Sequence, residues 1–260
     1  SMPKISITKK TAWSLILNIN ANPEYKTKKN IIDINEDFEK NTLKIRYNRK
    51  KNCIEDSNID LKNDIEDLFK IFFPIVCSQS KFQYIAHIAQ SLDGFIATKS
   101  GESRYISGKE NLEHIHRLRA VSDIIIVGAK TYLEDSPRLT TRLVKGNSPQ
   151  IYIFDPKIIL KKKDIVKNAI HLKDNLSVLN KNLQGKDKQT IYIEGGGKTI
   201  SYFMNKNILN KIHICLCPII LGGGRPSFIT DKYIKLNDVK SYKPNHYQMG
   251  KDVLFDIDLS

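Results

Sequence analysis

The sequence lacks the features of a membrane protein, a disulfide-rich scaffold or a disordered chain. None of its apolar runs approaches the ~20 residues of a membrane span, and no secretory signal peptide is visible near the N-terminus. Cysteine occurs only four times in 260 residues, which is too few for a disulfide scaffold of this size. The apolar fraction of 40% is that of an ordinary globular protein. These absences predict a globular, cytoplasmic protein without a membrane partner.

Residues 1–80 lack glycine and histidine altogether, so all 13 glycines and all six histidines lie in residues 81–260. This change of composition predicts an N-terminal accessory region of unknown role over 1–80 and the main domain over 81–260. The accessory region is expected to be small and α+β, with helices over 11–19 and 60–73 and a strand over 43–47. Pro74 is expected to end or kink the second helix.

Acidic residues are scarce relative to basic ones, because 28 Asp and Glu face 42 Lys and Arg, and the formal net charge is +14. Residues 81–260 carry 28 of the basic and 17 of the acidic side chains, and this excess can attract anionic ligands such as phosphates. Basic runs such as Lys161-Lys162-Lys163 lack the interleaved aromatic residues of a base-stacking surface. A nucleic-acid partner is therefore not expected.

From residue 82 onward, apolar runs alternate with helical patterns. Strands are expected over 84–89, 123–128, 150–155, 190–194 and 211–221, with two more over 245–249 and 252–259, and helices over 108–118, 174–183 and 198–204. Such alternation predicts an α/β domain with a sheet covered by helices on both faces. The late strands, joined by a short link, predict an antiparallel edge on an otherwise mostly parallel sheet.

The sharpest motif is a glycine turn, in which the strand ending at Glu194 meets Gly195, Gly196 and Gly197 and a helix follows. A helix N-terminus preceded by glycine suits a phosphate. A Walker A loop would need glycine at Tyr192, and a dinucleotide fingerprint would need glycine or alanine at Ile200, so neither standard loop applies. A tight connection without a ligand stays open as an alternative. Glu194 lies at the carboxyl end of a strand, where α/β sheets place ligand groups.

Other polar residues permit fewer conclusions. Arg119 and Arg142 could bind a phosphate as forks or form surface ion pairs. His114 and His116 lie two apart on an expected helix and point apart, so they cannot share a metal. Cys215 and Cys217 share one face of an expected strand and are read as core side chains. No metal site is predicted.

Five motifs, in fitting order and spacing, resemble the reductase domain of the riboflavin-biosynthesis deaminase/reductase family over residues 82–258. They are His87-Ile-Ala-Gln-Ser-Leu-Asp93-Gly94, Ser100-Gly-Glu-Ser103-Arg-Tyr105, Arg117-Leu-Arg119-Ala, the run from Gly128 through Thr131, Asp135 and Leu139 to Arg142, and Glu194-Gly195-Gly196. The resemblance implies a dihydrofolate-reductase-like fold, in which a mixed, mostly parallel sheet is flanked by helices.

The resemblance also implies an activity. The family reduces a ribosylaminopyrimidine 5′-phosphate, of the 5-amino-6-(5-phosphoribosylamino)uracil type, to the ribitylamino compound with NADPH. Hydride goes to the anomeric carbon of the opened, imine-like ribose. Residues matching the family's substrate contacts are Ser103, Arg119, Leu139, Arg142 and Glu194; those matching NADPH contacts are Ala89, Tyr105, Thr131, Asp135, Gly196, Gly197, Lys198, Thr199, Ile200, Ser201 and Tyr202. Glu194 and Asp135 are the carboxylates placed to assist proton movement.

The sequence departs from the family at three points. His87 stands where relatives carry lysine, and it could donate a proton or contact the substrate. Tyr105 replaces a common tryptophan, and the zinc motif of the deaminase half is absent, so deaminase activity is not expected. Two alternatives stay open: a reductase of the same fold acting on a pterin-like, imine or carbonyl substrate, and a basic, non-catalytic binding scaffold. A homodimer is expected from the resemblance.

Overall fold

A computed structural model describes residues 4–38, 41–103, 106–173, 176–230 and 235–260, and the chain divides into two compact units, Ser1–Ser80 and Lys81–Ser260. Among the described residues, no helix combines the length and the apolar character needed to cross a membrane.

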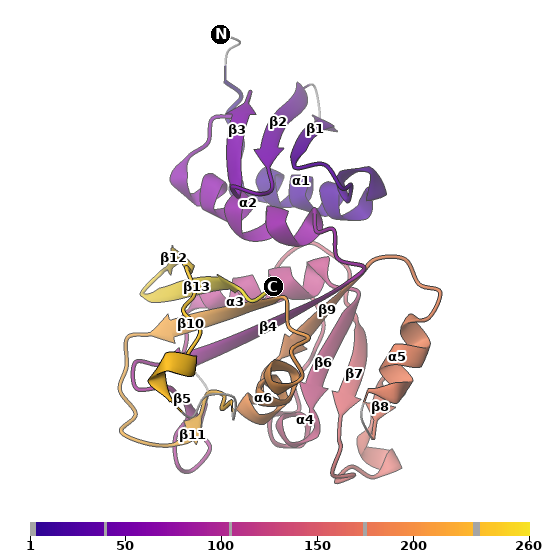
Figure 1. Ribbon diagram of the computed structural model, residues 1–260, viewed down its shortest axis with the longest axis vertical. Coiled ribbons are helices and arrows are strands. Elements are labelled where there is room, and N and C mark those ends of the chain that lie inside the picture. The colour runs from indigo at the N-terminus through magenta and orange to yellow at the C-terminus, as the bar shows by residue number, and fades with distance from the viewer. Residues whose placement is uncertain (1–3, 39–40, 104–105, 174–175, 231–234) are drawn as a thin grey trace. The chain divides into compact units, whose positions relative to one another are not determined.

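The first unit is a three-stranded antiparallel sheet with two helices (Figure 1). Its elements are α1 (Lys9–Ala21), the short 3-10 helix η1 (Pro23–Tyr25), β1 (Ile31–Phe38), β2 (Asn41–Asn48), β3 (Cys53–Ser57) and α2 (Asn63–Val76). The helices pack together through Trp13 and Phe72, whose ring centroids lie 5.2 Å apart. Tyr47 of β2 contacts Phe73 of α2 at the same centroid distance. The small α+β region expected from the sequence is thus present.

Pro74 was expected to end or kink α2. It does not end the helix, which runs on to Val76. A proline inside a helix removes one backbone hydrogen bond. The side chains on either side of it, Phe73 and Ile75, are buried, and so is Val76. Burial of these apolar groups holds the last turn in place despite the missing hydrogen bond.

The second unit is built on an eight-stranded sheet of order β12-β13-β10-β4-β9-β6-β7-β8, with a separate pair of β11 and β5. Its strands are β4 (Phe82–Ser91), β5 (Phe95–Ala97), β6 (Ile124–Gly128), β7 (Gln150–Phe154), β8 (Ile170–Leu172), β9 (Gln189–Glu194), β10 (Lys211–Cys217), β11 (Arg225–Pro226), β12 (Asn245–Met249) and β13 (Asp252–Asp258). Its helices are α3 (Lys109–Val121), α4 (Ala129–Asp135), α5 (Ser177–Leu183) and α6 (Gly197–Asn205), with 3-10 turns η2 (Lys162–Asp164) and η3 (Leu236–Asp238).

The strands from β10 to β8 pair in parallel, whereas β13 and β12 add antiparallel strands at one edge. The mixed, mostly parallel sheet predicted from the sequence is therefore confirmed. The strand expected over 211–221 is shorter than predicted and ends at Cys217. Pro218 has no backbone N–H to continue the ladder, which explains this end.

Helices cover both faces of this sheet, and Figure 1 shows α6 in front of it and α3 behind it. Alternate residues of β4 point to opposite sides. Tyr84 lies on the α6 side, 6.1 Å from Phe203 between ring centroids. His87 lies on the α3 side, where its Nε2 is 2.9 Å from Asn111 Oδ1.

The α3 side carries several buried polar groups. His114 Nε2 of α3 lies 2.9 Å from His213 Nδ1 of β10. His213 in turn contacts the carboxylate of Asp256 at 3.3 Å, and Lys211 donates to the same carboxylate at 2.5 Å. The core beneath α3 is therefore held partly by a contact between two imidazoles and by a buried ion pair.

Candidate active site

A cavity of about 490 Å³ opens at the carboxyl ends of three neighbouring parallel strands. Gly128 ends β6, Phe154 ends β7, and Gly196 follows β9, and all three residues line the cavity. Ligands of α/β sheets bind at this edge because the loops that leave the strands diverge there. The first turns of α4 and α6 form further parts of the wall, together with Arg225, Pro226, Phe228 and Ile229.

The glycine turn is shaped for close approach of the backbone to a ligand. Gly195 and Gly196 both have φ of 71°, a conformation that L side chains rarely adopt. A Cβ on Gly196 would lie 2.9 Å from Thr131 Oγ1, and a Cβ on Gly197 would overlap the carbonyl oxygen of Ser227. Gly196 caps α6, and the N–H of Thr199 donates to the Gly196 carbonyl at 2.9 Å. The N–H groups of Gly197 and Lys198, at the first two positions of the helix, have no carbonyl four residues earlier within it. These features fit a phosphate group held by backbone N–H.

The cavity also has an apolar wall and basic groups. The rings of Phe154 and Tyr202 lie 4.6 Å apart at their centroids, and both line the cavity. Lysines at its rim are Lys130, Lys157 and Lys198. Arg225 lies there too and donates to Glu134 at 2.6 Å. A ligand that combines an aromatic ring with phosphate groups, as a nicotinamide dinucleotide does, fits these surroundings.

Seven of the residues assigned to NADPH from the sequence line this cavity: Thr131, Gly196, Gly197, Lys198, Thr199, Ser201 and Tyr202. Ile200 instead packs, fully buried, in the core of the second unit. Ala89 lies within β4 opposite Cys215, and Asp135 is exposed at the end of α4. Tyr105 lies outside the described residues.

Sequence reasoning missed Phe154, Glu134 and Arg225 as cavity residues. Phe154 belongs to an apolar strand, where its type gives no functional signal. Arg225 follows three glycines, a feature that we interpreted as a strand-ending loop. Only the pairing of β11 with β5 and the contact with Glu134 bring Arg225 to this wall.

On the other side of the β9 end, Glu194 forms a fork with Arg119 of α3. Arg119 Nε donates to Oε2 at 2.7 Å and Nη2 donates to Oε1 at 2.5 Å. Arg119 is buried, with 6% of its surface exposed. Burial alone lowers the pKa of Arg119, but the hydrogen bond and charge of Glu194 raise it above its ordinary value. The pair is thus a buried, charge-compensated ion pair.

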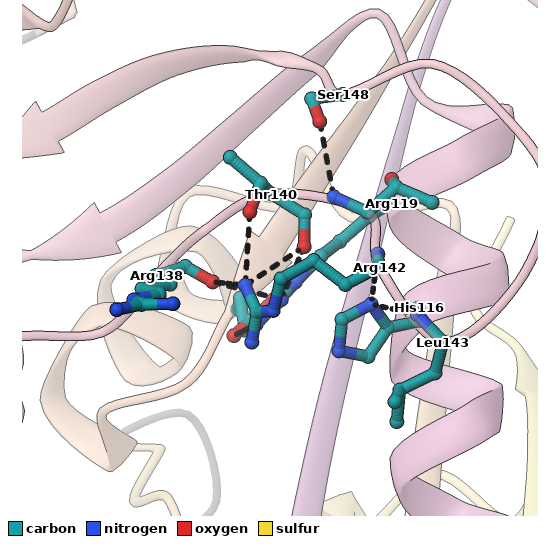
Figure 2. A network of polar contacts seen from close by, with 9 residues as sticks. His116, Arg119, Arg138, Thr140, Arg142, Leu143 and Ser148 are labelled. Carbon is teal, nitrogen blue, oxygen red and sulfur yellow. Dashed lines mark hydrogen bonds and ion pairs between the residues drawn. The ribbon is translucent and has the colours of Figure 1, made fainter.

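The same arginine holds the loop after α4, as Figure 2 shows. Arg119 Nη1 donates to the carbonyl oxygens of Arg138 at 3.0 Å and Thr140 at 2.9 Å. Arg142, which is exposed, donates through Nη1 to the Arg138 carbonyl at 2.7 Å and to Thr140 Oγ1 at 2.9 Å. Leu139 between them is 1% exposed. Two arginines and one buried leucine of the predicted substrate site therefore converge on one loop.

The remaining predicted residues lie in two different settings. Ser103 is exposed in the loop before α3. His87 is 3% exposed and pairs in register with Glu194 across β4 and β9. Because Asn111 Nδ2 donates to Ser107 Oγ, its Oδ1 faces His87, and the imidazole Nε2 is the donor. Burial and the charge of His213 lower the pKa of His87 to about 3, so the ring is neutral.

Among the residues that the structure describes, one group of three side chains has metal-ligand chemistry. Cys215, Cys217 and Asp252 are buried, and their two sulfurs and one carboxylate oxygen lie within 4.8 Å of one another. One oxygen of Asp252 already accepts from the N–H of Gly108 at 2.6 Å. A closed structural zinc site has four ligands, so these three described groups would need a fourth.

Comparison with known proteins identifies the second unit. The family model of the RibD C-terminal domain matches residues 83–255. The riboflavin biosynthesis protein RibD of Mycobacterium tuberculosis strain H37Rv is 32% identical over 144 residues, which cover 52% of this chain and 42% of that protein. The 2,5-diamino-6-ribosylamino-4(3H)-pyrimidinone 5′-phosphate reductase of Methanothermobacter thermautotrophicus is 31% identical over 172 residues, 54% of this chain and 79% of that protein. The chain thus spans less than half of the mycobacterial relative.

Solved structures share the fold. The deaminase/reductase of Thermotoga maritima matches 75% of this chain and 61% of its own with a TM-score of 0.58 and 24% identity. The yeast riboflavin biosynthesis reductase Rib7 matches 68% of this chain and 90% of its own with a TM-score of 0.52 and 20% identity. The family model covers most of the second unit, including the glycine turn and the loop of residues 138–143, called the arginine loop below. The chain belongs to the RibD C-terminal domain family.

Proposed function

We propose that the chain is an NADPH-dependent reductase that converts a ribosylaminopyrimidine 5′-phosphate to the ribitylamino product. The observation that carries the proposal is that the residues at the end of β9 take part in both the predicted substrate site and the predicted cofactor cavity. On one side Glu194 binds Arg119, which holds the arginine loop, and on the other side Gly196, two residues later, lines the cavity. The name of the Methanothermobacter relative, a ribosylaminopyrimidinone 5′-phosphate reductase, supports this substrate class.

The cavity would hold NADPH through the glycine turn, the basic rim and the apolar wall. The chemistry that NADPH supplies when bound is a hydride. The N–H groups at the start of α6 and Lys198 would hold phosphate oxygens. Phe154 and Tyr202 would exclude water from one side of the bound rings. In this way the chain orients the hydride donor towards the end of β9.

The substrate would lie against the arginine loop. The exposed Arg142 presents its guanidinium for the ribose phosphate. Arg119 is different, because Glu194 and two carbonyl groups already occupy four of its five N–H donors, and it serves to fix the loop. The carboxylate oxygens of Glu194 keep lone pairs that Arg119 does not use. These lone pairs can accept a hydrogen bond from the substrate and assist proton movement. Asp135 and His87 are kept as further candidates for that step.

Replacing Arg142 by alanine should raise KM for the phosphorylated substrate about 10- to 100-fold and leave kcat within about threefold. A hydrogen bond to a charged group contributes about 1.5–3 kcal/mol, and Arg142 is exposed, so its loss should not disturb the fold. Steady-state kinetics with phosphorylated and dephosphorylated substrate measure the effect. An equal rise of KM for both substrates would contradict the phosphate role.

Replacing Gly196 by alanine should weaken NADPH binding at least tenfold, because the new Cβ would lie 2.9 Å from Thr131 Oγ1 at the cavity wall. Gly195→Ala is the matched control, since Gly195 has the same φ of 71° but its Cβ would meet no atom within 4 Å. Fluorescence titration with NADPH compares the two. If both variants bind NADPH equally well, the cavity is not the cofactor site.

NADPH oxidation with freshly generated 5-amino-6-(5-phosphoribosylamino)uracil tests the function itself. Turnover that depends on the 5′-phosphate would establish it. NADPH binding without turnover would favour another imine, carbonyl or pterin-like substrate. The absence of NADPH binding would favour the non-catalytic scaffold. A homodimer and a cytoplasmic location, both expected from the sequence, stay part of the proposal.

A further inference from the structure

Two side chains on one face of α3 hold opposite polar groups of the same loop. His116 and Arg119 lie three residues apart, so their side chains are neighbours on the helix surface. Arg119 donates to two backbone carbonyl oxygens of the loop. His116 does the converse, because its Nδ1 accepts from the backbone N–H of Arg142 at 2.9 Å and of Leu143 at 3.3 Å (Figure 2). The loop is thus fixed through both its donors and its acceptors.

His116 is suited to this task by its surroundings. Its side chain is buried, with 4% of its surface exposed. An Nδ1 that accepts requires the neutral ring with its proton on Nε2. Burial, together with the charges of Arg119 and Arg142, lowers the pKa of His116 to about 4. The imidazole therefore stays an acceptor at neutral pH.

The hydrogen bonds of His116 act on Arg142, the residue proposed to bind the substrate phosphate. His116 holds the backbone of Arg142 from the buried side, while the guanidinium of Arg142 lies on the exposed side against Arg138 and Thr140. A long side chain on an unanchored loop loses much conformational freedom when it binds a phosphate. A backbone fixed in advance reduces that loss and favours the bound geometry.

We propose that His116 is a positioning residue of the phosphate site, which sets the affinity for the substrate phosphate by fixing the backbone of Arg142. The inference rests on the proposed function. It predicts that the hydrogen-bond acceptor at Nδ1, and not the imidazole ring as such, is what the site needs.

Two substitutions of nearly equal shape separate these possibilities. Asparagine places its Oδ1 where histidine has Nδ1, whereas leucine places a methyl group there. His116→Leu should raise KM for the phosphorylated substrate about tenfold and leave kcat and NADPH affinity within about threefold. His116→Asn should restore KM to within about threefold of the wild-type value. A merely structural role would not produce this split between the two variants.

A double-mutant cycle ties the effect to Arg142. In the Arg142→Ala background, His116→Leu should change KM by less than about twofold. If both His116 variants raise KM equally, or if the effect of leucine persists without Arg142, the inference is wrong. If His116→Leu does not fold, as judged by circular dichroism, His116→Gln replaces it, because its amide reaches the Nε2 position and leaves Nδ1 without a substitute.

The test also distinguishes the inference from the proposed function. If the wild-type chain does not reduce the pyrimidine substrate, calorimetric titration with ribose 5-phosphate becomes the measurement. Binding that is lost in His116→Leu and Arg142→Ala but kept in His116→Asn would support the inference even though the proposed function had failed. Equal binding by the wild type and all three variants, or no binding by the wild type, would overturn it.

Discussion

Replacing Glu194 by glutamine should lower kcat about a hundredfold and reduce the free energy of unfolding by about 3 kcal/mol, while the Kd for NADPH changes less than threefold. The loss of turnover follows from the proposed role of this carboxylate in proton movement, since general acid–base catalysis contributes about 10²–10⁴-fold to a rate. The loss of stability follows because removal of one partner leaves the buried charge of Arg119 uncompensated. Single-turnover kinetics and urea denaturation measure the two effects.

Glu134→Gln is the matched control for stability. Glu134 also pairs with an arginine, Arg225, but their side chains are 38% and 40% exposed. An exposed pair contributes about 0–1 kcal/mol, so this variant should unfold close to the wild type. If the two variants lose equal stability, the pair of Glu194 and Arg119 does not behave as a buried one. If Glu194→Gln weakens NADPH binding more than it lowers kcat, Glu194 belongs to the cofactor site and not to proton movement.

The sequence predicted the glycine turn well, because the signal is local. A strand, three glycines and a helix follow one another within a few residues, and the structure has β9, a turn with two positive φ values and α6 there. The contact between Glu194 and Arg119 could not be predicted from residue patterns, since the two lie 75 residues apart. The resemblance assigned both to the substrate, but only the fold shows that they bind each other.

Residue patterns could not predict two kinds of feature: short helices and strands, and side chains that act through hydrogen bonds to backbone groups. Helix α4 has seven residues and strand β5 has three, so neither contains enough of a periodic pattern to detect. His116 was interpreted only as unable to share a metal with His114. It accepts two hydrogen bonds from backbone N–H groups, and because every residue except proline has such a group, the residue types give no signal of this contact.

The buried histidines make stability depend strongly on pH, and we expect the free energy of unfolding to fall steeply below pH 6.5. Burial, the largest cause, and nearby positive charges lower the pKa of His87 to about 3, of His116 to about 4, and of His114 well below its ordinary value of 6.5. Above pH 6.5 these rings are neutral in both states. Below it the unfolded chain takes up protons that the folded chain does not, so stability decreases as the pH falls.

The expected size follows from about 1.4 kcal/mol per pH unit for each such histidine. Three histidines together should cost up to about 4 kcal/mol between pH 8 and pH 5.5, measured by urea denaturation at each pH. His116→Asn removes one of these groups and keeps its hydrogen-bond acceptor, so the slope should become shallower by about one third. His246→Asn is the matched control substitution, made at an exposed residue of β12. If the wild type and His116→Asn show the same slope, the ring of His116 takes up its proton in the folded state, and the Nδ1 anchor of the arginine loop would then open at mildly acidic pH.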